Sequence, residues 1–410
     1  MNKVSTRPGY MPYAITAAVL ATAGSALLKN GLIVYGAICW AVLVPLAAAA
    51  ALDRIEFDGR RIKRKGPMAF LLTHLANVRQ QLSITDIETV TTETSSLSFS
   101  NGEARLSYRT HISGAGADIH IRSHRSTYVP FIKALFKAMG PDKLDPRSFE
   151  LFEYFESRNS LKDNPVLRSE IAGLPVPLLR RIANSLKLAG RLAQASSYFR
   201  IAYEKEPRNP ELLYEMSRFF HSSAQAEDAR LLQRSDACLR LASRLAGKEP
   251  HLLERIGEAF FERLDYKRAA DCFQRALALD PARFRANVGL AEIALRDGKL
   301  AHVAHFYKAA ASSSDAALAR LAEREARYYE RLMRDDDFLE AELRRIRISN
   351  QIRWVRRLAT LTFFATWFAG AVAGRFYQEI EEFSWALMAS SGLAWVAVTV
   401  SMRYLFRRSI

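Results

Sequence analysis

Two stretches of this 410-residue chain repeat one spacing of small, aromatic and proline residues. In the first stretch, Ala195 is followed by Phe199, Ala202 and Pro207, at offsets of 4, 7 and 12 residues. The second stretch has the same residue types at the same offsets: Ala269, Phe273, Ala276 and Pro281. Small residues let paired helices approach, an aromatic ring fills the space between them, and proline ends the second helix. This self-similarity predicts stacked helix pairs.

The segment before each stretch carries the apolar pattern of a partner helix. These residues are Leu179, Ile182, Ala183 and Leu186 in one unit, and Leu253, Ile256, Gly257 and Phe260 in the other. A weaker unit lies between them and is about six residues longer than the usual ~34, with the excess near residues 221–227. A fourth unit at 284–310 lacks the closing proline, and a further long helix begins near Ser314. Four units exceed the ~3 needed to bury a continuous core.

These helix pairs resemble the tetratricopeptide repeat (TPR). The resemblance implies an α-helical solenoid with a capping helix over residues 176–355, whose concave face binds a protein partner or peptide. By repeat register, the residues expected on that face are Arg180, Asn184, Lys187, Tyr214, Arg218, His221, Glu254, Arg255, Glu258, Glu292 and Arg296. Arg180 and Asn184 occupy positions where chaperone-binding members hold a carboxylate, but Glu215 and His251 depart from that pattern. An ordinary solvated face is the alternative.

Both ends of the chain are strongly apolar. The apolar runs cover about 13–28, 32–52, 358–373 and 383–402, each close to the ~20 residues that a helix needs to cross a membrane. They predict four transmembrane helices, as hairpins at 1–52 and 356–410. A cleaved signal peptide is the alternative for the first run. The spans lack ionisable residues, which argues against a transporter.

Basic residues flank the apolar runs on one side of the predicted membrane. The net charge of +16 is concentrated there, with Arg54 and the cluster at 60–65 after the second run and six arginines before the third. The positive-inside rule then places both termini and the middle of the chain in the cytoplasm. The same distribution favours anionic lipid over nucleic acid as the partner of this charge. Three scattered cysteines fit a reduced compartment.

Residues 53–140 change to the two-residue period of β-strands. Leu97 and Phe99 alternate with polar residues, Asn101-Gly102 predicts a hairpin turn, and residues 131–139 form an amphipathic helical pattern. These features resemble the bacterial pleckstrin-homology-like (PH-like) domain, which often follows a two-helix hairpin. Residues 68–81 instead have a helical pattern. The residues expected to meet lipid headgroups are Arg60, Arg61, Lys63, Arg64 and Lys65. Alternatively, they only fix the topology. Residues 141–175 are expected to be a helical linker.

No motif in the chain predicts catalysis. HExxH, CxxC, GxSxG and P-loop sequences are absent. His120 with His124, and His302 with His305, lack companion ligands for a metal. We therefore expect neither a cofactor nor a metal site, and no enzyme. A membrane enzyme with an unrecognised site is the least favoured alternative.

Together these patterns predict a multidomain membrane protein, with a TPR-like solenoid, a small antiparallel PH-like β domain and four transmembrane helices. The expected function is a scaffold or assembly factor that recruits a protein partner to the cytoplasmic face of a bacterial inner (plasma) membrane. A lipid-sensing or lipid-handling role of the β domain is the alternative. The sequence leaves a homo-oligomer open.

Overall fold

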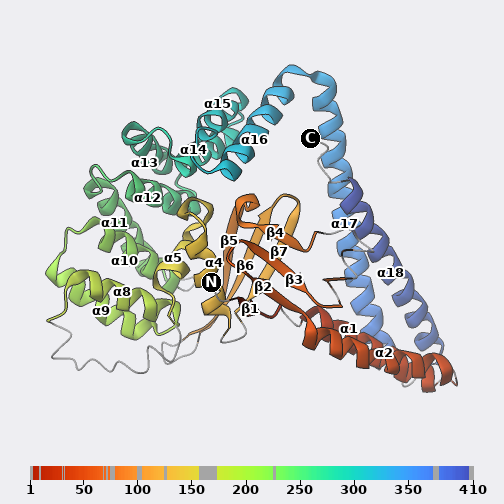
Figure 1. Ribbon diagram of the computed structural model, residues 1–410. Helices are drawn as coiled ribbons and strands as arrows, with labels where there is room; N and C mark the ends of the chain where they lie inside the picture. The colour runs from red at the N-terminus through yellow and green to blue at the C-terminus, as the bar shows by residue number, and fades with distance from the viewer. Residues whose placement is uncertain are drawn as a thin grey trace. The chain divides into compact units, whose positions relative to one another are not determined.

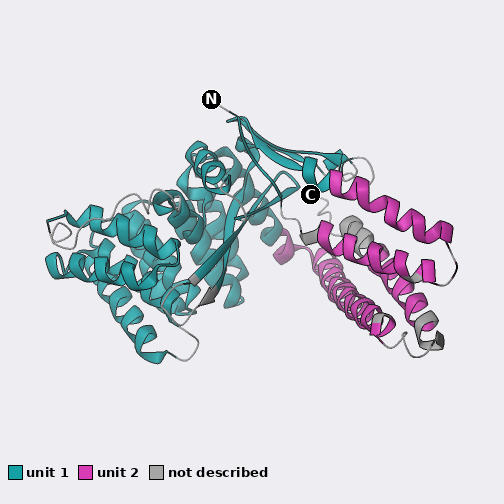
Figure 2. Cartoon of the chain, turned by 90° about the horizontal axis from the view of Figure 1, so that it is seen from below, with its two compact units in different colours: residues 1–11, 49–330 teal, residues 12–48, 331–410 magenta. Residues whose placement is uncertain are grey.

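The computed structural model describes residues 3–8, 11–29, 31, 33–67, 69–70, 73, 79–98, 104–123, 127–156, 173–224, 228–372 and 378–405. The chain forms two compact units (Figure 2). Unit 1 contains residues 1–11 and 49–330, and unit 2 contains residues 12–48 and 331–410.

Unit 1 begins with two small antiparallel sheets that make up a β domain. The first has the order β1-β2-β3-β4, with strands Val4–Thr6, Arg54–Phe57, Arg61–Lys65 and Gln81–Ser83. The short 3-10 helix η1 (Ile84–Asp86) leads to the second sheet, which has the order β5-β6-β7, with strands Thr89–Ser98, Ala104–Gly114 and Ala117–Arg122. Strand β1 precedes the first apolar segment and β2 follows it, yet Thr6 pairs with Ile55. Both ends of that segment therefore lie in one sheet.

The β domain has its own apolar core, closed by helix α4 (Tyr128–Ala138). Phe131 of α4 is fully buried and packs edge-on against Phe57, with ring centroids 6.3 Å apart. The predicted turn at Asn101-Gly102, most of the predicted helix at 68–81, and His124 lie outside the described residues. After α4, the 3-10 helix η2 (Pro141–Lys143) leads to α5 (Pro146–Tyr154), where Asp145 caps the first turn by accepting a hydrogen bond from the Ser148 amide.

The solenoid consists of helix pairs in the predicted order. The pairs are α8 (Val176–Leu188) with α9 (Leu192–Lys205), α10 (Pro210–Ser223) with α11 (Ala229–Leu245), α12 (Pro250–Glu262) with α13 (Tyr266–Leu279), and α14 (Phe284–Arg296) with α15 (Leu300–Ala310). Helix α16 (Ala316–Arg334) follows. Phe273 lies between two glycines: a Cβ added at Gly257 or Gly289 would come within 2.7 or 2.5 Å of its ring. The spacing of small and aromatic residues therefore predicts this packing correctly.

Unit 2 contains two helical hairpins. Helices α1 (Met11–Lys29) and α2 (Ile33–Leu52) approach closely at Gly24, where a Cβ would come within 2.8 Å of the Trp40 ring. Helices α17 (Asp336–Val372) and α18 (Gln378–Leu405) approach at Gly370, where a Cβ would lie 3.3 Å from the Ser384 Cβ. The Trp367 indole donates a hydrogen bond to the Thr22 hydroxyl (2.9 Å), which joins the two hairpins.

The prediction of four membrane-spanning helices is wrong. Among the described residues, α2 is the one helix long and apolar enough to cross a membrane, and α1 is a shorter apolar helix. Helix α17 begins at Asp336 and carries the arginine-rich segment within itself, so its apolar part, 358–372, falls short of a span. Helix α18 begins with charged residues and contains several serines. The chain is mostly helical, with small antiparallel sheets, and is not a four-span membrane protein.

Candidate functional site: the inner face of the solenoid

The first helix of each repeat contacts the segment from Leu144 through α5, which packs on the β domain. Figure 1 shows α8 to α16 as an arc beside α5 and the strands, all within unit 1. Helix α5, which belongs to the segment expected to be a linker, packs directly against α8. Its Leu151 and Tyr154 join the apolar core of the β domain together with Leu188 of α8. The surface expected to bind a peptide is therefore in contact with the protein's own chain.

Glu150 of α5 is the centre of this contact. Its carboxylate is 2% exposed and forms ion pairs with Arg147 (3.0 Å), Lys187 (3.3 Å) and Arg218. Burial alone would raise the pKa of Glu150, but these cations hold the pKa well below its usual range. Burial lowers the pKa of Lys187 to about 8 against the opposing effect of Glu150. Lys187 and Arg218, both expected to meet a partner, here neutralise a carboxylate of the same chain.

Arg180 and Asn184 are also engaged within the chain. Arg180 donates two hydrogen bonds to Glu215, at 2.9 and 2.8 Å, and a further one to Glu211. The Tyr154 hydroxyl donates to the same Glu215 carboxylate at 2.6 Å. Asn184 is 1% exposed and donates to the Arg180 carbonyl. Glu215, which departs from the carboxylate-binding pattern, supplies a built-in carboxylate for Arg180.

The middle repeats continue the same contact. The Arg255 guanidinium lies 4.3 Å from the ring centroid of Phe149 in α5 and 4.9 Å from that of Tyr214. Arg285 of α14 pairs with Glu258 and also donates to the Leu144 carbonyl at the start of α5. Burial raises the pKa of Glu258 to about 7, although Arg285 opposes this shift. These residues bind the linker to α12 and α14.

Contacts at the two ends of the array complete the attachment. The Tyr108 hydroxyl of β6 donates to the Leu188 carbonyl (2.6 Å) at the end of α8. Arg324 of α16 donates two hydrogen bonds to Glu88, at 3.2 and 3.1 Å. The array therefore holds the β domain from α8 to α16.

Part of the predicted inner face remains open to solvent. His221 and Glu292 are exposed, and so is Arg296, whose guanidinium lies 3.6 Å from the Tyr266 ring centroid. Glu254 is buried and pairs with Arg283. A pocket of about 280 Å³ opens at the start of α12, and its lining residues are Glu211, Lys248, Glu249, Pro250, His251, Leu252 and Arg255.

Comparison with known protein families agrees with this architecture. Residues 250–283 match the family model of the tetratricopeptide repeat. One helix pair of the solenoid is thus similar to a tetratricopeptide repeat. The match covers α12 and α13, and Phe273 of α13 packs against Gly257 of α12. It does not extend to the β domain, whose resemblance to PH-like domains stays a prediction. No curated protein matches the chain.

The predicted headgroup cluster contains both paired and unpaired cations. Arg64 donates from Nε and Nη2 to Asp53, with the shortest contact at 2.5 Å. Lys65 pairs with Glu56 at 2.6 Å, which holds the pKa of Glu56 below its usual range. The side chains of Arg60, Arg61 and Lys63 are exposed. The cluster therefore has two kinds of cation, of which the unpaired ones are open to a ligand.

Histidines and acidic residues do not gather into a metal site in the described part of the chain. His111 and His120 stack across β6 and β7 with ring centroids 4.3 Å apart, and His111 contacts Asp118 at 3.2 Å. His302 and His305 both lie on exposed positions of α15. Two histidines and one carboxylate at an exposed sheet surface do not form a closed coordination shell.

Proposed function

We propose that this protein is a TPR scaffold whose inner face holds its own β domain and whose outer side captures an acidic protein partner. The supporting observation is a row of exposed arginines on α11, called here the α11 ridge: Arg230, Arg234, Arg240 and Arg244. Leu241 and Leu245, beside them, are 37% and 36% exposed. Spacings of three and four residues bring most of these side chains to one helix face.

The α11 ridge differs from the exposed faces of neighbouring helices. In α9, Arg200 pairs with Glu204, and in α13, Arg275 pairs with Asp271. The four ridge arginines have no ion pair with any residue that the structure describes. Four unneutralised guanidinium groups beside two exposed leucines complement an amphipathic helix with acidic flanks. We therefore assign the partner as an acidic helical segment of another protein. Binding, rather than catalysis, is the proposed activity.

We further propose that α1 and α2 enter a membrane as a hairpin. Within the most apolar stretch of α2, only 6% of the residues are buried in the protein, so this helix lacks a protein environment for its apolar side chains. Because β1 pairs with β2, the chain must leave and return on the same side. The basic residues of β3 then favour the cytoplasmic side of a bacterial inner membrane.

Capture of partners by the full-length tagged protein, solubilised from membranes in a mild detergent, tests the proposed scaffold. A variant with the four ridge arginines changed to glutamate is expected to capture at least tenfold less of the partner. The matched control changes Arg200 of α9 and Lys267 and Arg268 of α13 to glutamate and is expected to capture it normally. Retention of the same partner by the ridge variant would overturn the assignment of α11.

Replacing residues 8–52 by a short turn that keeps β1 paired with β2 tests the membrane hairpin. The shortened protein is expected to move from the membrane fraction to the soluble fraction after cell breakage. Circular dichroism and capture of the partner through the α11 ridge serve as controls for folding. A shortened protein that stays in the membrane fraction contradicts the hairpin as the anchor.

A further inference from the structure

The turn between α12 and α13 holds a leucine in a backbone conformation that favours glycine. Leu264 has a φ of +63°, which lies in the left-handed region. Gly190 and Gly298 occupy the same place in the turns of the first and fourth helix pairs, with φ values of +82° and +73°. In all three turns, the amide of this residue donates to the carbonyl three residues earlier, at 2.9 to 3.0 Å. The fold therefore uses glycine in two of these turns and a strained leucine in the third.

The Leu264 side chain contributes little to the core of the solenoid. It is 69% exposed, more than any other large apolar side chain that the structure describes in α8 to α16. A left-handed leucine costs free energy, and packing within the chain does not offset this cost. Leu264 is therefore a candidate for a contact outside its own chain.

Leu264 belongs to an exposed patch at one edge of the solenoid. We call this patch the turn patch, and its members are Leu264, Tyr266, Glu292, Leu295 and Arg296. The Arg296 guanidinium lies 3.6 Å from the ring centroid of Tyr266, which brings the end of α14 to the start of α13. Leu295 is 40% exposed, and Glu292 lies one helical turn before Leu295 and Arg296. The turn patch thus joins the turn after α12 to the end of α14.

Two charges of opposite sign flank the exposed leucines of the turn patch. Glu292 and Arg296 are exposed, and neither forms an ion pair with a residue in the described part of the chain. The nearby Lys299 and Asp297 instead pair with each other at 2.9 Å. A surface with one cation and one carboxylate complements a copy of itself across a two-fold axis, because each charge then meets its opposite. The α11 ridge has one sign of charge and lacks this property.

We infer that the turn patch is a contact between two copies of this chain. Leu264 and Leu295 of one copy pack against the same leucines of the other. Glu292 of each copy pairs with Arg296 of the other. Burial of Leu264 in this contact offsets the cost of its left-handed backbone. The inference does not rest on the proposed partner, since the α11 ridge lies on a different helix.

The oligomeric state of the full-length protein in neutral detergent tests the inference. Size-exclusion chromatography with light scattering, over a range of protein concentrations, is expected to give a dimer for the wild type. Leu264→Asp is expected to weaken dimerisation about tenfold or more, because it places two carboxylates at the centre of the contact. The matched control Leu279→Asp changes a leucine that is 46% exposed at the end of α13 and is expected to remain a dimer.

A second pair of variants separates the contact from the strain of the turn. Leu264→Ala and Leu264→Gly both remove the apolar side chain, so both are expected to weaken dimerisation. Leu264→Gly is expected to unfold at a higher denaturant concentration than Leu264→Ala, because glycine adopts a positive φ without strain. Equal unfolding midpoints would contradict the strain at Leu264.

Exchange of the two charges tests the pairing across the two-fold axis. Glu292→Arg and Arg296→Glu each bring like charges together and are each expected to weaken dimerisation. The double variant Glu292→Arg/Arg296→Glu restores opposite charges and is expected to dimerise as the wild type does. A monomeric wild type, or a control Leu279→Asp that dissociates as much as Leu264→Asp, would overturn the contact. A double variant that dimerises more weakly than both single variants would overturn it as well.

Discussion

The inner and outer sides of the solenoid use the same residue types in different ways. On the inner side, Arg180, Lys187 and Arg218 are buried or nearly so, and each pairs with a carboxylate of the same chain. On the α11 ridge, the arginines are exposed and have no ion pair in the described part of the chain. A buried cation with a partner supports the fold, whereas an exposed cation without one is available for binding. Position in the repeat alone does not distinguish the two uses.

The inner side also shows that a helical-repeat array can bind a segment of its own chain. Helix α5 lies where a bound peptide helix is expected, with Phe149 against Arg255 and Glu150 against Lys187 and Arg218. The array therefore acts on a covalently attached segment, at an effective concentration that no separate peptide reaches in solution. Under the proposed function, the partner binds to surfaces that α5 does not cover.

The largest expected effect comes from removing the charge of Glu150. Glu150→Gln leaves Lys187 buried without an ion pair among the described residues and leaves Arg218 with Glu262 alone, so the free energy of unfolding is expected to fall by about 3–5 kcal/mol. Denaturant unfolding followed by circular dichroism measures this change. The control Glu153→Gln changes an exposed carboxylate on the same helix and is expected to have little effect. Equal stability of the two variants would show that the inner contact does not support the fold.

A smaller effect is the pH dependence of stability that Glu258 causes on the inner side of the solenoid. Burial raises its pKa to about 7 from the model-compound value of 4.5. Between these values the folded protein binds more protons than the unfolded chain, so its stability falls as the pH rises through this window. The expected fall is on the order of 2 kcal/mol.

Glu258→Gln cannot titrate, so this fall in stability is expected to disappear from its pH profile. Unfolding free energies measured between pH 5 and pH 8 check this expectation. Glu249→Gln, at an exposed position before α12, is the control and is expected to keep the wild-type profile. A Glu258→Gln profile parallel to that of the wild type would assign the pH dependence to other groups.

Tyr154→Phe tests the difference between the inner and outer sides at a single hydrogen bond. The variant removes the hydroxyl that donates to Glu215 at 2.6 Å but keeps the ring in the apolar core. Because the acceptor is charged and buried, we expect a loss of about 1.5 kcal/mol in the free energy of unfolding. Tyr203→Phe, 39% exposed on α9, is the outer-side control and is expected to be neutral. Equal losses in both variants would remove the distinction between the two sides.

The repeats could be predicted from the sequence because their signal is local. Ala269, Phe273 and Ala276 lie within two helical turns, and their spacing alone implies a paired helix. The contact of α5 with the solenoid could not be predicted in this way, since Glu150 and Arg218 are 68 residues apart. A sequence signal for this contact is that aromatic and acidic residues alternate in α5. Both faces of this short helix are therefore packed.

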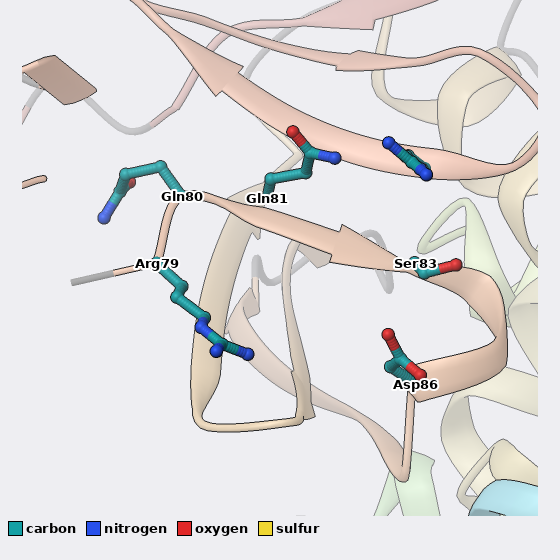
Figure 3. Close-up of a pocket in the computed structure, with 6 residues that line it drawn as sticks. Arg79, Gln80, Gln81, Ser83 and Asp86 are labelled. Carbon is teal, nitrogen blue, oxygen red and sulfur yellow. The ribbon is translucent and has the colours of Figure 1, made fainter.

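The prediction of four membrane spans failed, and the pairing of the basic cluster could not be predicted, for a related reason. An apolar run does not reveal where its helix begins, and α17 starts 22 residues before Leu358. Likewise, a basic cluster does not reveal which cations are paired: Arg64 meets Asp53 only after β2 and β3 align. The helical pattern at 68–81 includes Arg79, whereas the structure places this residue in the segment entering β4, where it lines a pocket of about 460 Å³ (Figure 3). The pairing of neighbouring strands determines where Arg64 and Arg79 lie.

The smallest expected change in stability comes from the α11 ridge itself. Arg240→Gln combined with Arg244→Gln removes two exposed charges that have no ion pair within the described residues, so the free energy of unfolding is expected to stay within about 0.5 kcal/mol of the wild type. Partner capture by the same double variant is expected to fall, because the charges that complement an acidic helix are gone. Denaturant unfolding and capture are measured on one preparation. A ridge variant that loses stability as much as Tyr154→Phe would mean that the ridge belongs to the fold, as the inner side does.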